Sequence, residues 1–126
     1  MPKILIADDV PFIRLLLEEC LEGLVDKGAE ILFAENGKDA LDTIVRERPD
    51  LVFLDVMMPK MNGYEVCNAV KNELKINDVC IVMLTAKGQE FDRQKGNNAG
   101  ADIYITKPFK PVEVVQAAEK ALNMGG

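Results

Sequence analysis

Histidine and tryptophan are absent from this chain of 126 residues. Without histidine, the chain lacks the usual general base, the commonest metal-binding side chain and any catalytic Ser–His or Cys–His pair. Cysteine is scarce, and Cys20, Cys67 and Cys80 lie in apolar periodic segments at a spacing that matches no zinc motif. We therefore expect buried, reduced thiols that serve as small apolar side chains.

Basic charge and long apolar runs are also in short supply. Lysine and arginine number 15 against 21 aspartates and glutamates, which gives a formal net charge of -6. A protein with this negative charge is repelled by nucleic-acid phosphates and by anionic membranes, so direct binding to either is disfavoured. The apolar run at 4–7 is too short for a signal peptide or a spanning helix, and no other run is long enough. We expect a cytoplasmic protein.

The remaining composition fits one globular domain over residues 1–126. Apolar residues make up 48% and charged residues 29%, which is ordinary for a folded domain of this common size. Five short apolar runs predict strands at 4–7, 31–34, 51–54, 80–84 and 103–105. Most runs are continuous rather than alternating, which is typical of parallel strands covered on both faces.

Segments with helical periodicity separate these strands. Their apolar positions recur three and four residues apart. They are Ile13, Leu16, Leu17, Cys20, Leu21 and Leu24; Ala40, Leu41, Ile44 and Val45; Val66, Cys67, Val70 and Leu74; and Val112, Val115, Ala118 and Leu122. Pro111 suits the first turn of the last segment. The stretch 89–98 contains a single large apolar residue, Phe91, and an internal Gly96, which predicts a weakly held, mobile helix.

Strand and helix therefore alternate five times along the chain. Parallel strands need crossover connections, and these are right-handed. We expect the α/β class: a flavodoxin-like, doubly wound (βα)5 fold whose five-stranded parallel sheet has the order 2-1-3-4-5.

Polar side chains stand at the carboxyl ends of four predicted strands. Asp8 and Asp9 follow the first strand, Asp55 the third, Thr85 the fourth and Lys107 the fifth. Sites in such sheets form beyond these ends, and the predicted order makes the first and third strands neighbours. The three aspartates are therefore expected to share one pocket.

Three carboxylates in one pocket require a cation, because they repel one another. Oxygen ligands without histidine or cysteine favour Mg²⁺, and with Lys107 the formal charges sum to zero. A carboxylate can attack phosphorus, a reaction that depends mainly on positioning and charge neutralisation. Asp55 is the candidate nucleophile, with Lys107 and Thr85 as candidate ligands of the phosphoryl oxygens. For Asp9 a simple helix-capping role stays open.

Four motifs then identify a resemblance by their order and spacing. They are Asp8-Asp9; Leu54-Asp55-Val56-Met57-Met58-Pro59 with Asn62-Gly63; Leu84-Thr85-Ala86; and Gly100-Ala101-Asp102 leading to Lys107-Pro108-Phe109. Over essentially its whole length the chain resembles the bacterial, chemotaxis-Y-like receiver domains of two-component response regulators. Asn62 stands where many relatives have Asp, and we interpret Asn62-Gly63 as a turn and helix start.

The resemblance implies a phosphorylation switch. Asp55 would accept a phosphoryl group from a phosphohistidine of a sensor histidine kinase or phosphotransfer protein, and a downstream protein effector would read the result. Asp9, Asp55 and the backbone carbonyl of Met57 would ligate Mg²⁺, with Asp8 assisting through water. The chain would be no enzyme beyond its own phosphorylation and dephosphorylation.

Further roles follow from the same resemblance. Thr85 would swing toward the phosphoryl group, and Tyr104 would turn inward behind it. The Lys107–Pro108 bond would be cis, although trans is the default expectation from sequence alone. The partner-binding face would comprise the 89–98 segment, the fifth strand and the last helix.

Two positions would tune the loss of phosphate, and three would meet the kinase. Met57 and Lys87 lie two residues after Asp55 and Thr85, and we expect the apolar Met57 to shield the phosphoryl group from water. The candidate kinase contacts are Pro11, Phe12 and Ile13, although Ile13 also fits the core.

Two alternatives belong to other functional classes. A Mg²⁺-dependent phosphohydrolase with an Asp nucleophile would place a carboxylate two residues after it as general acid, where this chain has Met57. A receiver-like interaction module without phosphorylation would lack a pocket residue, whereas this chain keeps them all.

Overall fold

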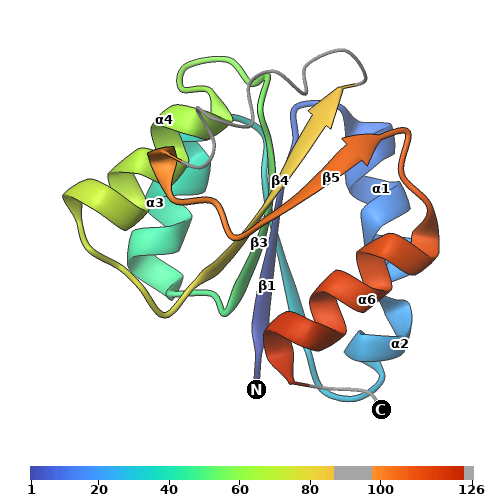
Figure 1. The fold of residues 1–126 in the computed structure, drawn as a ribbon. Helices are drawn as coiled ribbons and strands as arrows, with labels where there is room; N and C mark the ends of the chain where they lie inside the picture. The colour runs from blue at the N-terminus through green and yellow to red at the C-terminus, as the bar shows by residue number, and fades with distance from the viewer. Residues whose placement is uncertain (87–97, 124–126) are drawn as a thin grey trace.

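The structure, a computed structural model, describes residues 1–86 and 98–123. A parallel sheet forms its centre, with helices on both faces (Figure 1). The strands are β1 (Lys3–Ala7), β2 (Glu30–Ala34), β3 (Leu51–Asp55), β4 (Cys80–Ala86) and β5 (Ile103–Lys107). Their order is β2-β1-β3-β4-β5, and each neighbouring pair is parallel. The predicted α/β doubly wound fold is confirmed.

The helices divide between the two faces of the sheet. One face carries α1 (Pro11–Cys20), α2 (Glu22–Val25) and α6 (Pro111–Leu122), and the other carries α3 (Gly37–Glu47), α4 (Gly63–Asn68) and the π-helix η1 (Ala69–Glu73) (Figure 1). The weak helix predicted at 89–98 lies, apart from Asn98, outside the described residues. Within the described parts of the chain, no helix is both long and apolar enough to cross a membrane.

Strand β3 shows why the apolar runs are continuous. Its residues alternate between two cores, as side chains on a strand must. Val52 and Leu54 pack in the core beneath α3 and α4, while Leu51 and Phe53 pack in the core beneath α1 and α6. All four side chains are fully buried. The edge strand β2 is only partly covered, and Phe33 on it is 45% exposed.

Some details of the predicted helical stripes are wrong. Val45, Leu74 and Val112 are exposed rather than packed. Helix α6 buries Ala118 as predicted, but its other buried residues are Val114 and Ala117, which the predicted stripe left out. Small side chains such as alanine let a helix approach a sheet closely, although they contribute little to an apolar pattern. The first stripe belongs to two helices, since α1 ends at Cys20 and α2 begins at Glu22.

The exposure of Leu74 has a backbone cause. The Leu74 N–H donates to the Ala69 carbonyl at 2.8 Å, which is an i→i+5 hydrogen bond rather than the i→i+4 bond of an α-helix. One π-helical turn holds an extra residue and so shifts the phase of every later side chain. Apolar spacing assumes a constant period, and therefore could not anticipate this shift.

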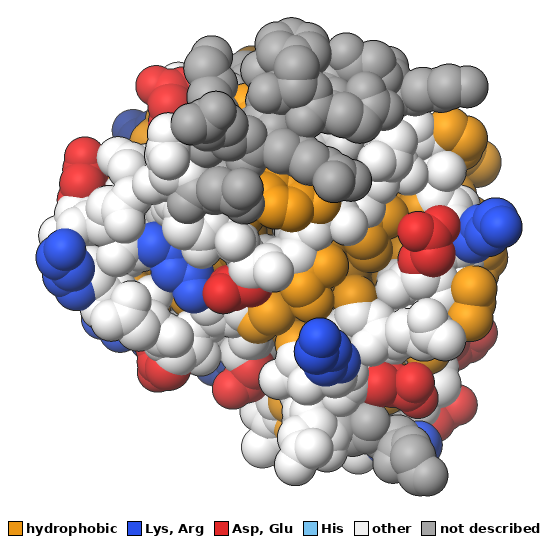
Figure 2. Space-filling view, viewed as in Figure 1, with side chains coloured by type: hydrophobic (Ala, Val, Ile, Leu, Met, Phe, Trp, Pro, Cys, Tyr) orange, Lys and Arg blue, Asp and Glu red, His pale blue; other side chains and the backbone are white. Residues whose placement is uncertain are grey.

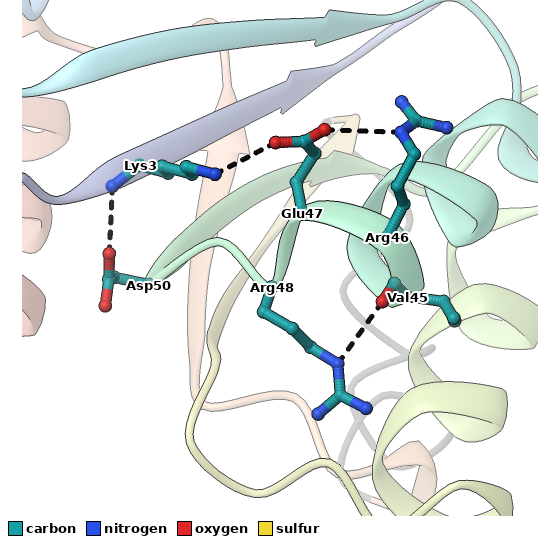
Figure 3. Close-up of polar contacts among 6 residues, drawn as sticks. All are labelled: Lys3, Val45, Arg46, Glu47, Arg48 and Asp50. Atoms are coloured by element: carbon teal, nitrogen blue, oxygen red, sulfur yellow. Dashed lines mark hydrogen bonds and ion pairs between the residues drawn. The ribbon is translucent and has the colours of Figure 1, made fainter.

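A polar network closes the amino-terminal end of the sheet, opposite the predicted site (Figure 3). The Lys3 backbone N–H donates to Asp50 Oδ2 at 2.8 Å, and Lys3 Nζ lies 2.9 Å from Glu47 Oε1. These contacts fix the start of β1 to the end of α3 and the turn before β3. These contacts hold β1 and β3 in register at their amino-terminal ends. The same register places the aspartates side by side at the carboxyl ends of the two strands.

Candidate functional site

The three predicted aspartates meet at the carboxyl edge of the sheet. Asp55 is the last residue of β3 and is 6% exposed, while Asp8 follows β1 and is fully buried. Asp9 is exposed beside them. One carboxylate oxygen from each residue lies within 4.8 Å of those of the other two. Adjacent parallel strands that end at the same level produce this cluster.

Lys107 reaches the cluster from the edge strand β5. It is the last residue of β5, and β4 and β3 separate it from β1. Its Nζ lies 2.8 Å from Asp8 Oδ2 and 3.1 Å from Asp55 Oδ1. One ammonium group therefore bridges two of the three carboxylates, an arrangement that only the folded sheet can produce.

In both Asp55 and Lys107, contacts with groups of opposite charge counteract the effect of burial on the pKa. Burial raises the pKa of Asp55 to about 6 and the neighbouring Asp8 charge adds to that rise, while Lys107 and a hydrogen bond from the Met57 backbone N–H oppose it. Burial alone would lower the pKa of Lys107, but its hydrogen bond to Asp8 and the charges of Asp55 and Asp8 raise it overall. One lysine thus leaves the pocket short of positive charge.

The Asp8 backbone and side chain are fixed from several directions. Asp8 Oδ1 accepts a hydrogen bond from the Val10 N–H at 2.9 Å, and the Asp8 N–H donates to the Ala34 carbonyl at 3.2 Å. Arg14 donates to the Asp8 carbonyl at 2.6 Å and lies 3.6 Å from Glu35. Sequence reasoning missed Arg14 and Glu35.

One signal could have revealed Arg14. It precedes the buried Leu17 by three residues and the buried Leu21 by seven, so it falls on the inward face of α1. Its side chain is only 16% exposed. A charged residue on an apolar helix face needs a partner, and here the partners are Asp8 and Glu35.

Thr85 occupies the same sheet edge between Asp55 and Lys107. It is 4% exposed and belongs to β4, which extends to Ala86. Leu84 pairs with Asp55, and Ala86 pairs with Lys107. Thr85 lies between these two β4 residues, so it is one residue beyond the level of Asp55 and one residue before the level of Lys107. Tyr104, on β5, is half-buried and packs against the core beneath α3 and α4.

The loop after β3 forms one wall of the pocket. The Met57 side chain is 62% exposed. Met57 and Asp9 both line a hollow of about 470 Å³, together with residues 58–62. The interpretation of Asn62-Gly63 as a helix start is confirmed, because Asn62 and Glu65 form a capping box with two hydrogen bonds of 2.9 Å.

The other predicted residues are placed as follows. The Lys107–Pro108 peptide bond is cis. Phe12 is 67% exposed, whereas Ile13 packs against the core beneath α1 and α6. Lys87 lies outside the described residues. All three cysteines are free, but only Cys67 is buried as predicted, whereas Cys20 and Cys80 are partly exposed. Burial raises the pKa of Cys67 to about 12, as expected of an inert thiol.

The donor set is compatible with Mg²⁺. Hard divalent cations prefer carboxylate oxygens, and the cluster offers three such groups with no competing imidazole or thiolate. Burial and the Asp8 charge raise the pKa of Asp55, so a second positive charge would stabilise its ionised form.

Comparison with known proteins gives concordant results. Residues 4–119 match the family described as "Response regulator receiver domain". The chain is 48% identical over 112 residues to a probable transcriptional regulator, ycf27, of Galdieria sulphuraria, covering 89% of this chain and 42% of that protein. It is 36% identical over 115 residues to the protein PilG of Pseudomonas aeruginosa, covering 91% of this chain and 83% of that one. The chain thus spans less than half of the ycf27 protein.

A solved structure agrees over nearly the whole chain. The crystal structure of a putative response regulator from Chloroflexus aurantiacus superposes with a TM-score of 0.85 at 35% identity. The match covers 98% of this chain and 100% of that one.

Proposed function

Because the chain belongs to the response regulator receiver domain family, we propose that Asp55 is its phosphoacceptor and that the acidic cluster binds Mg²⁺. The chain is the receiver domain of a two-component response regulator. The observation that carries the assignment of Asp55 is the bridge from Lys107 Nζ to both Asp8 and Asp55, beside a third carboxylate within 4.8 Å.

Asp55 has the properties of a positioned nucleophile. It ends a strand that is buried on both faces, and the Met57 N–H and Lys107 Nζ orient its carboxylate. A carboxylate oxygen of Asp55 would attack the phosphorus of a phosphohistidine, and the bond from phosphorus to the imidazole nitrogen would break. Catalysis would be confined to the phosphorylation and dephosphorylation of the chain itself.

The proposed cation would complete the charge balance. Asp8, Asp9, Asp55 and the backbone carbonyl of Met57 would hold it, and it would offset repulsion between the carboxylates and the incoming phosphoryl oxygens. Lys107 would bind one phosphoryl oxygen as a point charge, and the Thr85 hydroxyl would donate a hydrogen bond to another.

Phosphorylation of Asp55 would change the conformation of side chains on β4 and β5. Thr85 would move toward the new oxygens, and Tyr104, one strand away in register with Met83, would turn inward. Figure 2 shows apolar side chains gathered over the edge strand β5, between α4 and α6. A hollow of about 310 Å³ there is lined by Tyr104, Ile105 and Ala117 among others. This surface would receive the downstream protein effector.

The phosphodonor would approach from the pocket side. Val10, Phe12 and Leu15 are 43%, 67% and 52% exposed directly after the aspartates. An apolar patch beside a charged pocket suits a protein partner that carries the phosphohistidine, either a sensor histidine kinase or a phosphotransfer protein. We place the domain, which would be the single domain of residues 1–126, in the cytoplasm, where such kinases present their phosphohistidine.

Labelling by a small acyl phosphate tests the proposal. The 126-residue chain should incorporate one phosphoryl group in the presence of Mg²⁺, and chelation should abolish the reaction. Asp55→Asn should remain unlabelled. Equal labelling of the Asp55→Asn variant would place the acceptor elsewhere.

A further inference from the structure

The junction between β2 and α3, formed by Glu35, Asn36 and Gly37, lies between the loop that carries Asp8 and Asp9 and the loop that follows Asp55. Neither the fold nor the proposed chemistry requires any of its side chains in the pocket. Its contacts nevertheless reach both sides of the site. We propose that this junction is a spacer, with Gly37 as the positioning residue that sets where the loop after Asp55 lies relative to Asp8 and Asp9.

One side of the junction is attached to the first acidic loop. The Asp8 N–H donates to the carbonyl of Ala34, the residue just before the junction, at 3.2 Å. Arg14 connects the same two segments, since it donates to the Asp8 carbonyl at 2.6 Å and lies 3.6 Å from Glu35 Oε1. Asn36 caps α3 by accepting a hydrogen bond from the Asp39 N–H at 2.8 Å. This cap fixes the position of Gly37, which is the first residue of α3.

The other side abuts the loop after β3. The Gly37 N–H donates to the Pro59 carbonyl at 3.3 Å. A Cβ atom built on Gly37 would lie 1.9 Å from the backbone oxygen of Met61 and 2.6 Å from its carbonyl carbon. These are backbone atoms, so no side-chain rotation relieves the overlap. Glycine is therefore required at this position for the two backbones to touch.

The loop has little freedom to absorb a displacement. At its far end the Gly63 N–H donates to the Val56 carbonyl at 2.8 Å, and a Cβ on Gly63 would lie 2.5 Å from the Asp55 carbonyl oxygen. At its near end Met57 donates its N–H to the Asp55 carboxylate. A displacement of Met61 would therefore shift Met57 and Asp55. The distances from the Asp55 carboxylate to the carboxylates of Asp8 and Asp9 would then change.

The test is Gly37→Ala in the 126-residue chain, compared with Gly23→Ala. Gly23 lies in α2, and a Cβ there would meet nothing within 4 Å, so the two variants share the chemical change but differ in the contact. The measurements are Mg²⁺ affinity by titration calorimetry and the rate of acyl phosphate labelling. Circular dichroism and thermal unfolding record whether each variant is folded.

The spacer predicts a selective loss. Folded Gly37→Ala should bind Mg²⁺ and label with an efficiency reduced about tenfold or more, because misplacement of reacting groups by about an ångström is costly. Gly23→Ala should keep the parent values. A folded Gly37→Ala variant with parent Mg²⁺ affinity and labelling would overturn the inference.

A second variant keeps the inference testable if Gly37→Ala does not fold. Arg14→Lys retains the charge but loses the planar fork that reaches both Asp8 and Glu35. It should weaken Mg²⁺ binding a few-fold, while Arg46→Lys, at the exposed pair with Glu47, should not. Equal affinities for these two variants would then reject the spacer.

The labelling arm of this test rests on the proposed function, but the two can fail separately. If the parent chain is never labelled, the phosphoacceptor proposal fails, and Mg²⁺ affinity alone decides the role of Gly37.

Discussion

At the scale of single residues, the pKa of Asp55 links the site to the stability of the fold. Burial and the neighbouring Asp8 charge raise its pKa to about 6 from an ordinary value of 3.8. The folded state therefore holds the Asp55 proton more tightly than the unfolded state does. The cost of ionising Asp55 is absent below the unfolded pKa, grows as the pH rises, and is complete above the folded pKa.

This linkage predicts that Asp55→Asn stabilises the metal-free domain. At about pH 7 the gain in the free energy of unfolding should be about 1 to 3 kcal/mol, and it should shrink toward about pH 4. Denaturant unfolding at the two pH values measures it. Added Mg²⁺ should stabilise the parent more than the variant. Lower stability of Asp55→Asn at neutral pH would contradict the prediction.

Met57 offers a second residue-scale prediction, which concerns lifetime rather than stability. Its exposed thioether side chain lines the hollow beside Asp9, where an attacking water would pass. Met57→Asn replaces an apolar shield with a side chain that can hold water, so dephosphorylation should accelerate a few-fold. The decay of the labelled protein after donor removal measures the rate. An unchanged or slower decay would count against shielding, and Met57→Leu should decay like the parent.

At the scale of elements, the capping box determines where α4 begins and therefore where the loop after Asp55 ends. Asn62 accepts from the Glu65 N–H, and Glu65 accepts from the Asn62 N–H. Asn62→Ala removes one of these bonds and should lower the free energy of unfolding by about 1 kcal/mol. Asn62→Asp keeps an acceptor oxygen and should remain near the parent. Thermal unfolding distinguishes them, and equal losses in both variants would exclude capping as the cause.

Elements also show how far local sequence patterns reach. All five strands lie where apolar runs predict them. The runs are clearest in β1, β3 and β4, because strands buried on both faces can tolerate little polarity. The helices are less faithful to their patterns. The π-helical hydrogen bond at Leu74 and the break at Leu21 change the helical period locally, whereas an apolar pattern assumes a constant period.

At the scale of the whole molecule, two apolar cores on opposite faces of one sheet keep the strand ends aligned. Phe53 and Phe33 make this testable. Both lie on the sheet face that α1 and α6 cover, but Phe53 is 0% exposed in the core and Phe33 on the edge strand is 45% exposed. Phe53→Ala should cost about 3 to 5 kcal/mol of unfolding free energy. Phe33→Ala should cost under about 1 kcal/mol. Urea unfolding measures both, and similar losses would mean that the β2 edge is as tightly packed as the centre.

The sequence by itself determined the class of the fold, the order of its strands and the chemical groups at their carboxyl ends. The class and the chemical groups follow from local patterns: apolar runs of strand length, helical periods between them, and the residue that follows each run. The strand order follows from the flavodoxin-like fold expected of that class. Aspartates 8, 9 and 55 could be assigned to one pocket because strand order alone makes their strands neighbours.

Only the tertiary structure decided the distances. It placed one ammonium group between Asp8 and Asp55, brought the Arg14 guanidinium to the Asp8 carbonyl, and packed Gly37 against the backbone of Met61. Each of these contacts joins segments far apart in the chain, and its geometry depends on how helices and loops settle on the finished sheet. Local patterns specify which groups are present, whereas packing specifies which of them touch.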